Sequence, residues 1–222
     1  MSAVIVAIDG PAASGKSTLA RLLADRHGWA YINTGQMYRA VAYFGLRAKL
    51  SLPDDTMAAI KIANDINFSI INNTLLINGE NLSDPISQPV VEKIVSSFAA
   101  IPEIRRLLVQ KQRNIAKTQS VVMDGRDIGT VVFPDATLKI FLVARAAVRA
   151  QRRFDELQHR FSDNFPSYDE ILRDIEQRDT EDRERAVSPL IKASDAILID
   201  TSSLSIAETL QKIEDLLSGA VS

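Results

Sequence analysis

Residues 10–17 carry a phosphate-binding pattern, since they read Gly-Pro-Ala-Ala-Ser-Gly-Lys-Ser with the spacing G-x-x-x-x-G-K-[ST]. The two glycines allow the backbone to direct its N–H groups at phosphate oxygens without interference from a Cβ atom. Lys16 supplies a cation for the β- and γ-phosphates, and the Ser17 hydroxyl can ligate Mg²⁺. The pattern therefore predicts a nucleoside triphosphate site made by Gly10, Ala12, Ala13, Ser14, Gly15, Lys16, Ser17 and Thr18.

The segments on either side of this loop support the prediction. Residues 3–8 form an unbroken apolar run of strand length, as expected for a strand that is buried on both faces. After the loop, Leu19, Leu22 and Leu23 recur at helical spacing, so the loop opens a helix whose N-terminal dipole also favours anions. The alternative, an ordinary glycine-rich turn, does not account for this order of strand, loop and helix.

A second candidate group lies in residues 34–39, which read Thr-Gly-Gln-Met-Tyr-Arg. We interpret Thr34 as the N-cap of a helix, because threonine favours that position. Tyr38 and Arg39 then lie one turn into the helix, where they can meet a second phosphate. The alternative is a capped helix that carries a surface arginine.

A third group follows a predicted buried strand, in residues 124–129, which read Asp-Gly-Arg-Asp-Ile-Gly. In open α/β sheets, ligands bind outside the carboxyl ends of the strands. Asp124, Arg126 and Asp127 are therefore candidate ligand contacts. The alternative is a turn with local ion pairing.

A fourth group lies in residues 176–185, which contain no apolar side chain. Arg178, Asp182 and Arg185 are spaced i, i+4 and i+7, so they share one face of a helix. Two guanidiniums held by a carboxylate can stabilise the charge of a phosphoryl group in transfer. The alternative is a solvated helix face, whose ion pairs contribute about 0.3–0.5 kcal/mol each.

The elements that must position these groups alternate along the chain. Beyond the strand at 3–8, apolar runs predict strands at 29–33, 120–124, 138–143 and 196–200. Helical spacing and prolines predict helices after the phosphate-binding loop, at 36–49, from 53, and at 89–99, 102–116 and 146–157. Two further helices are predicted after capping boxes, one formed by Ser167 with Glu170 and one by Ser205 with Glu208. Since strands alternate with helices, we expect an α/β fold with a parallel sheet in three layers.

Residues 67–82 interrupt this alternation. Short β-prone pieces are separated there by Asn-Asn and Asn-Gly, which is typical of a hairpin. The segment predicts a small antiparallel patch within an inserted subdomain. Residues 159–166 are polar and are predicted to form a loop.

Composition limits the function classes. The 222 residues suffice for one large domain, which would bury roughly 70% of its unfolded surface. The net charge of −2 and pI of about 5.8 provide no long-range attraction to nucleic acid or to an anionic membrane. The absence of cysteine, of a signal peptide and of an 18-residue apolar segment predicts a cytoplasmic protein. We expect a monomer with no nucleic acid or membrane partner.

Among proteins with this phosphate-binding loop, the other motifs favour a small kinase. A regulatory GTPase needs an Asn-Lys-x-Asp element for guanine, and the sequence has none. A motor-type ATPase would show a strand ending in Asp-Glu, whereas Asp124 is followed by Gly125. A kinase that acts on a phosphorylated acceptor needs additional arginines for the second anion, and the sequence supplies them.

The motifs together resemble bacterial cytidylate (CMP) kinases, which belong to the nucleoside monophosphate kinases. The resemblance covers essentially the whole chain and rests on residues 10–16, 34–39, 124–136 (Asp-Gly-Arg-Asp-Ile-Gly-Thr-Val-Val-Phe-Pro-Asp-Ala) and 178–190. It implies a three-layer P-loop fold with a five-stranded parallel sheet in a single kinase domain. The domain would comprise a core at 1–64 and 102–222, a monophosphate-binding insertion at about 65–101 and a short lid at about 153–168.

The resemblance also implies a reaction and roles for single residues. The reaction is the transfer of a phosphoryl group from ATP to CMP or dCMP, with Mg²⁺, in pyrimidine metabolism. Four residues would act in catalysis: Lys16, Arg126, Arg178 and Arg185. CMP would be bound through its phosphate by Arg39, Arg126 and Arg185 with Thr34 and Tyr38, through its base by Ser96, Arg105 and Asp127, and through its ribose by Asp182 and Arg178, with Asp124 in the same site. Arg153 would bind ATP from the lid, and Ser17 would ligate the metal.

The chemistry of cytosine agrees with this assignment. Cytosine presents an N4–H₂ donor, with acceptors at N3 and O2. A carboxylate from Asp127 and donors from Arg105 and Ser96 form the complementary set. Uracil places an acceptor where cytosine has its donor, so a buried Asp127 would face a second acceptor. We therefore expect CMP and dCMP to be preferred over UMP.

Two other functions remain open at this stage. One is a kinase of the same fold that acts on UMP, dTMP or a small metabolite. The other is a non-catalytic, nucleotide-dependent RNA-binding regulator, for which the basic helix at 105–117 is the best support. The overall acidic balance and the absence of a basic face with interleaved aromatic residues disfavour the regulator.

Overall fold

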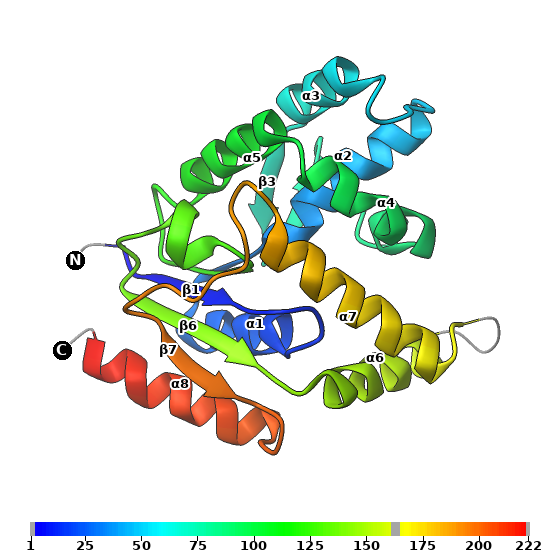
Figure 1. Cartoon of the computed structure of the whole chain (residues 1–222). Coiled ribbons are helices and arrows are strands. Elements are labelled where there is room, and N and C mark those ends of the chain that lie inside the picture. Colours follow the sequence, from blue (N-terminus) through cyan, green and yellow to red (C-terminus); the bar gives the residue numbers. More distant parts are fainter. Residues whose placement is uncertain (1–2, 161–164, 221–222) are drawn as a thin grey trace.

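The computed structural model describes residues 3–160 and 165–220, and its centre is a parallel sheet of five strands. The strand order is β2-β5-β1-β6-β7. The strands are β1 (Ile5–Asp9), β2 (Ala30–Asn33), β5 (Val121–Gly125), β6 (Leu138–Val143) and β7 (Ile197–Asp200). The predicted α/β fold with a five-stranded parallel sheet is confirmed, and the carboxyl ends of β1 and β6 point toward α6 and α7 (Figure 1).

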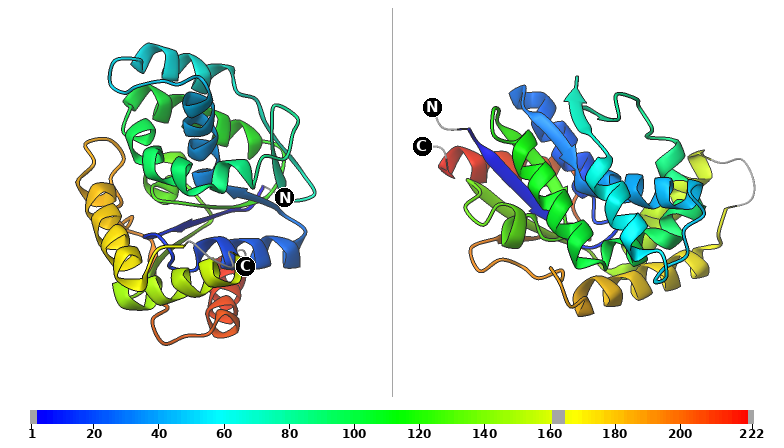
Figure 2. Two further views of the ribbon diagram at one scale, coloured as in Figure 1. Left: turned by 90° about the vertical axis from the view of Figure 1, so that its right-hand side faces the viewer. Right: turned by 90° about the horizontal axis from the view of Figure 1, so that it is seen from above.

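Helices cover both faces of the sheet, as three layers require (Figure 2). Neighbouring residues of one strand point to opposite faces, so Ala7 belongs to one core cluster while Val6 and Ile8 belong to the other. The Ala7 face is covered by α2 (Thr34–Arg47), α3 (Thr56–Asp65), α4 (Pro89–Ala99) and α5 (Pro102–Ile115). The opposite face is covered by α1 (Lys16–His27) and α8 (Ile206–Ala220).

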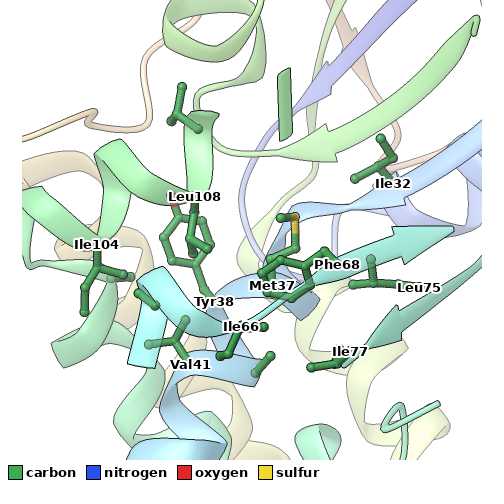
Figure 3. Packing of buried hydrophobic residues seen from close by; sticks show 14 of the residues in the cluster. Ile32, Met37, Tyr38, Val41, Ile66, Phe68, Leu75, Ile77, Ile104 and Leu108 are labelled. Atoms are coloured by element: carbon green, nitrogen blue, oxygen red, sulfur yellow. The ribbon is translucent and has the colours of Figure 1, made fainter. Parts of the chain in front are cut away.

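A two-stranded antiparallel sheet, β3 (Phe68–Ile71) with β4 (Thr74–Ile77), confirms the predicted hairpin. Its turn residues Asn72 and Asn73 both have positive φ, which asparagine tolerates better than most residues. Phe68, Leu75 and Ile77 are buried in the same core as Met37 and Tyr38 of α2 (Figure 3). After the hairpin, the short turn η1 (Pro85–Ser87) leads into α4. The boundaries at 65 and 101 stay a prediction.

Two packed helices, α6 (Ala146–Arg160) and α7 (Tyr168–Glu184), lie at the carboxyl end of the sheet (Figure 1). The predicted capping box at the start of α7 is present, since the side chains of Ser167 and Glu170 each accept a backbone hydrogen bond of the other residue. The prediction that α6 ends at 157 is wrong by three residues, so residues 159 and 160, the start of the predicted loop, are helical. Of the predicted lid, residues 161–164 lie outside the described residues.

No helix in the described part of the chain combines the length and the apolar character needed to cross a membrane.

Candidate active site

The phosphate-binding loop lies between β1 and α1, and its backbone geometry explains why two of its positions are glycine. A Cβ atom at Gly10 would lie 2.1 Å from the carbonyl oxygen of Leu142, so only glycine fits against β6. Gly15 precedes α1 with a φ of 94°, in the region that favours glycine. Ala13 also has positive φ, at 56°. The loop that the pattern predicts is thus in place, with Thr18 exposed in the first turn of α1.

Lys16 is buried at the centre of the loop, at 5% exposure. Its Nζ donates to the carbonyl of Pro11 at 2.6 Å and contacts the Oγ of Ser14 at 3.4 Å. Burial lowers the pKa of Lys16, the neighbouring Arg126 lowers it further, and Asp124 acts in the opposite direction. An anion bound beside Lys16 would favour its charged form, so this site is suited to a phosphate.

Ser17 belongs to a hydrogen-bond network around the Asp124 carboxylate. The Ser17 hydroxyl donates to one carboxylate oxygen of Asp124 at 2.9 Å, and the Tyr31 hydroxyl donates to the other at 3.0 Å. The amide of Asn33 donates to both hydroxyls at 3.2 Å. Burial raises the pKa of Asp124, whereas Lys16 lowers it.

These oxygens fit a magnesium ion that is bound mainly by nucleotide phosphates. Mg²⁺ prefers oxygen ligands and is usually held by one or two protein groups together with phosphates and water. Ser17 is exposed while Asp124 lies behind it, so both can face an ion on the phosphate side of the loop. In the described residues no cluster of three or more His, Cys, Asp or Glu could hold a metal on its own.

The start of α2 differs from the prediction. Asn33, not Thr34, is the N-cap, because the Asn33 side chain accepts from the backbone N–H of Gln36 at 3.1 Å. Thr34 is the first helical residue, and its hydroxyl donates to the carbonyl of Asp124 at 2.8 Å. Asparagine caps helices at least as well as threonine, and Asn33, the last residue of β2, supplies the cap while the helix begins directly at Thr34. Thr34 therefore links α2 to the end of β5.

A buried pair, Arg105 with Asp127, joins α5 to the loop after β5. The guanidinium donates to the carboxylate at 2.5 Å, and the side chains are 3% and 5% exposed. Arg105 also donates to the carbonyl of Ala99 and lies 5.0 Å from the ring centroid of Tyr38. Burial acts to lower the pKa of Arg105, but Tyr38 and Asp127 outweigh it and raise the pKa. Ser96 lies one turn before Ala99 on α4 and is partly buried.

Four arginines that the sequence assigns to phosphate or ribose, Arg39, Arg126, Arg178 and Arg185, form what we call the arginine cluster. Arg126 donates from Nε to Asp182 at 2.6 Å, and Arg185 lies 3.7 Å from the same carboxylate. Burial alone would raise the pKa of Asp182, but Arg126, Arg178 and Arg185 outweigh it and lower the pKa. The fold thus brings α7 to the loop after β5.

The other two members of the cluster are less well paired. Burial lowers the pKa of Arg178, and the like charges of Arg126 and Arg39 lower it further. Burial also lowers the pKa of Arg39, and its Nε is buried without a hydrogen-bond partner in residues 3–160 and 165–220. An unpartnered buried nitrogen such as Arg39 Nε is expected where an anionic ligand completes the site.

Arg185 departs slightly from the predicted helix face. The helix α7 ends at Glu184, and Arg185 is the C-cap residue with extended backbone. Its Nε donates to the carbonyl of Val187 at 2.9 Å, and its Nη2 donates to the carbonyl of Ser188. Arg105, Asp127 and Tyr38 all act on the pKa of Arg185, which burial lowers, so Arg185 lies beside the buried pair.

Arg153 lies on α6 and is held by two carboxylates. It donates to Glu92 of α4 at 2.8 Å and to Glu156 of its own helix at 2.9 Å. Glu92 also acts on the pKa of Arg39 and Arg178, so α4 contributes an acid to the arginine cluster. The sequence prediction assigned Arg153 to ATP and did not identify Glu92 as its partner.

Sequence reasoning also missed two buried charged residues. Asp9, at the end of β1, accepts backbone hydrogen bonds from Ile128 and Gly129 at 2.9 and 2.8 Å. Arg149 on α6 is bidentate to Asp179 of α7 and donates to the carbonyl of Ala12 in the phosphate-binding loop at 3.1 Å. A polar residue that ends an apolar strand at the sheet's carboxyl edge was an available signal for Asp9. Nothing local distinguishes Arg149 from its neighbours.

Comparisons with known proteins agree with this geometry. The family model described as cytidylate kinase matches residues 6–218. A cytidylate kinase of Clostridium botulinum (strain Langeland) is 44% identical over 210 residues, which are 95% of each chain. A cytidylate kinase of Fervidobacterium nodosum is 45% identical over 211 residues, which are 95% of this chain and 94% of the relative.

Among solved structures, an uncharacterised protein from Eubacterium ventriosum aligns with a TM-score of 0.52 and 11% identity, over 97% of this chain and 98% of the other. That likeness concerns the fold alone. The match over almost the whole chain and the identity to the two kinases together establish the family: this chain belongs to the cytidylate kinases.

Proposed function

We propose that this protein transfers the γ-phosphoryl group of ATP to CMP or dCMP, giving ADP and CDP or dCDP. The observation that carries the proposal is the position of the buried Arg105–Asp127 pair beside the arginine cluster and at the same sheet edge as the phosphate-binding loop. A triphosphate on the loop and a monophosphate among the arginines would meet between them. The relatives named cytidylate kinase support the same substrates.

The buried pair supports cytosine as the base. Asp127 offers a carboxylate acceptor for the N4–H₂ donor, and Arg105 offers donors for N3 and O2. Both groups are almost fully buried, so a base with the wrong pattern would leave a polar group unpaired without help from water. Sites of this kind can discriminate steeply between analogues.

The arginine cluster supports the transfer step through charge. Two anionic nucleotides repel one another, and the phosphate of CMP must approach the γ-phosphate closely. Arg126 and Arg185 are held by Asp182, so they are oriented before a ligand binds. Little covalent chemistry is needed from the protein, because catalysis of phosphoryl transfer is mainly alignment and neutralisation of charge.

Mg²⁺ fits the same proposal, with Ser17 as its protein ligand and Asp124 behind it. When bound, the ion supplies charge neutralisation on the phosphate oxygens. Asp124 would then orient the Ser17 hydroxyl, and Lys16 would hold the phosphates from within the loop. A closing lid that excludes water, as predicted for the segment around 153–168, would limit wasteful hydrolysis of ATP.

A coupled assay with ATP, Mg²⁺ and each of CMP, dCMP, UMP, AMP and GMP tests the function. We expect kcat/KM to be highest for CMP and dCMP. If UMP comes within about threefold of CMP, the assignment of Arg105 and Asp127 to the base is wrong. If no monophosphate is turned over and RNA binds in a salt-dependent manner, the protein is the regulator instead.

A further inference from the structure

Asp9 occupies a position that the proposed reaction does not use directly. It is the last residue of β1, stands immediately before Gly10 and is 5% exposed. Its two carboxylate oxygens each accept one backbone hydrogen bond, from the N–H of Ile128 at 2.9 Å and from the N–H of Gly129 at 2.8 Å. The carboxylate thus joins the start of the phosphate-binding loop to the loop that carries Arg126 and Asp127.

The two amides are the first of a short helical turn, η2 (Ile128–Val132). The first amides of a helical turn have no partner within it, and the residue just before the turn normally supplies the cap. Asp127 holds that place but makes no capping bond, because its carboxylate accepts from Arg105 instead. Asp9 provides the cap from the neighbouring strand.

We propose that Asp9 is a positioning residue for base selection, which caps η2 and thereby leaves the Asp127 carboxylate free to face Arg105 and the base. The assignment of Asp127 to the base rests on the proposed function; the capping role does not. Without the Asp9 carboxylate, the nearest replacement cap is Asp127 itself. Asp127 would then turn from Arg105 to the backbone, and the site would lose its acceptor for N4–H₂.

The register of the sheet brings Asp9 close to the loop after β5. Asp9 is in register with Gly125 on β5, so the loop must turn back over the end of β1 for its amides to reach the carboxylate. A Cβ atom at Gly129 would lie 3.5 Å from Asp9 Oδ2 and 3.2 Å from the side chain of Lys139. Gly129 thus packs directly against both side chains.

The first test is Asp9→Asn, which keeps the size of the side chain. Asparagine has one acceptor oxygen, and its NH₂ group would face the second amide, which is also a donor. We expect the CMP-to-UMP ratio of kcat/KM to fall by about tenfold or more and the KM for CMP to rise, with the KM for ATP changed less than about threefold. An unchanged ratio would overturn the role in base selection.

The matched control is Ile140→Val, a buried position on the neighbouring strand β6. This variant loses one methylene from the core and should lower the melting temperature without affecting the cap. We expect its CMP-to-UMP ratio to equal that of the wild type. If Ile140→Val shifts the ratio as much as Asp9→Asn does, the effect reports lost stability and the proposal is wrong.

A double-mutant cycle with Asp127→Asn identifies the route of the effect. If Asp9 acts through Asp127, the double variant should select bases no worse than Asp127→Asn alone. Additive losses of selectivity from the two substitutions would show that Asp9 acts by another route and would contradict the proposal.

Amide hydrogen exchange in the ligand-free protein tests the cap without any assay of activity. We expect the amides of Ile128 and Gly129 to exchange about tenfold faster in Asp9→Asn and to be unaffected in Ile140→Val. Unchanged exchange would overturn the capping role. If the wild type does not prefer CMP over UMP, the proposed function is wrong. If Asp9→Asn nevertheless exchanges these two amides faster than the wild type does, the capping role of Asp9 still holds.

Discussion

The two anion-binding regions of the molecule are built in opposite ways. In the phosphate-binding loop, consecutive residues supply the site, and much of it is backbone held in shape by Gly10 and Gly15. In the arginine cluster, side chains converge from α2, α7 and the loop after β5, with a carboxylate from Asp182 between them. The first region is local in sequence, whereas the second exists only once the chain is folded.

The two regions also handle charge differently without ligand. Lys16 is satisfied by the carbonyl of Pro11 and the hydroxyl of Ser14, so its charge is free for a phosphate. In the arginine cluster, Arg126 is instead paired with Asp182, and next to the cluster Arg105 is paired with Asp127. The loop therefore offers a cation whose hydrogen-bond partners are neutral, while in the arginine cluster an acid already fixes the direction of Arg126.

The comparison can be tested most strongly at Lys16. We expect Lys16→Ala to lower kcat by about 10³-fold, because the variant removes the cation of the loop at the point where charge moves in transfer. The exposed Lys61→Ala is the control and should leave kcat within twofold of the wild type, roughly 0.4 kcal/mol. Steady-state kinetics with saturating ATP and CMP measure both. A loss confined to the KM for ATP would contradict the catalytic role of Lys16.

The second test concerns the buried pair. Arg105→Met should lower the free energy of unfolding by about 3 kcal/mol, because it leaves the Asp127 carboxylate buried and unpaired. Arg126→Met should cost less, about 1–2 kcal/mol, since Arg126 and Asp182 are 20% and 13% exposed. The exposed Arg106→Met on the same helix as Arg105 is the control. Urea unfolding gives the free energy of unfolding of each variant. Equal losses for Arg105→Met and Arg126→Met would show that the more buried pair does not contribute more to stability.

A third test measures how the stability of the protein depends on pH through Asp9, which lies between the two regions. Burial, and to a smaller extent the carboxylate of Asp127, raise the pKa of Asp9 to about 6 against the opposing effects of its two amide partners and Lys16. The folded protein therefore holds the Asp9 proton more tightly than the unfolded chain does. The Asp9 contribution to stability falls as pH rises from about 4 to 6, by about 3 kcal/mol, and is constant above that.

Asp9→Asn removes this titration. Urea unfolding of both proteins between pH 4 and 7 should therefore show that the wild type loses stability relative to the variant up to about pH 6. Lys16 and Asp124 remain in both proteins, so their own titrations largely cancel in the difference. Parallel curves over the whole range would contradict the raised pKa of Asp9.

The smallest expected effect concerns the ion pair between α4 and α6. Glu92 and Arg153 are 29% and 25% exposed, so their pair contributes about 0.5–1 kcal/mol. If Arg153 binds ATP, Glu92 competes with the phosphate for it, and Glu92→Gln should lower the KM for ATP by about two- to fivefold. Glu156→Gln is the control, because Glu156 contacts the same arginine but is 57% exposed. A raised KM in Glu92→Gln would show that the pair assists binding instead.

Several elements could be predicted because their signals are local. The apolar runs at 120–124 and 138–143 became β5 and β6 with nearly the predicted bounds, and Ser167 with Glu170 became a capping box. The N-cap of α2 was misassigned by one residue, since Asn33 and Thr34 are both good caps and only the folded backbone decides which side chain accepts from the N–H of Gln36. The end of α6 was placed three residues too early, because helix ends depend on packing as well as on local sequence.

The sequence by itself determined the phosphate-binding loop, the parallel α/β fold and the family, because each follows from residues that are close together or from motifs with fixed spacing. Only the tertiary structure decided which charges meet. Asp9 caps a turn more than one hundred residues away, Arg105 pairs with Asp127, and Glu92 reaches Arg153. Such pairings depend on how strands and helices pack, and the spacing of residues along the chain carries no record of that packing.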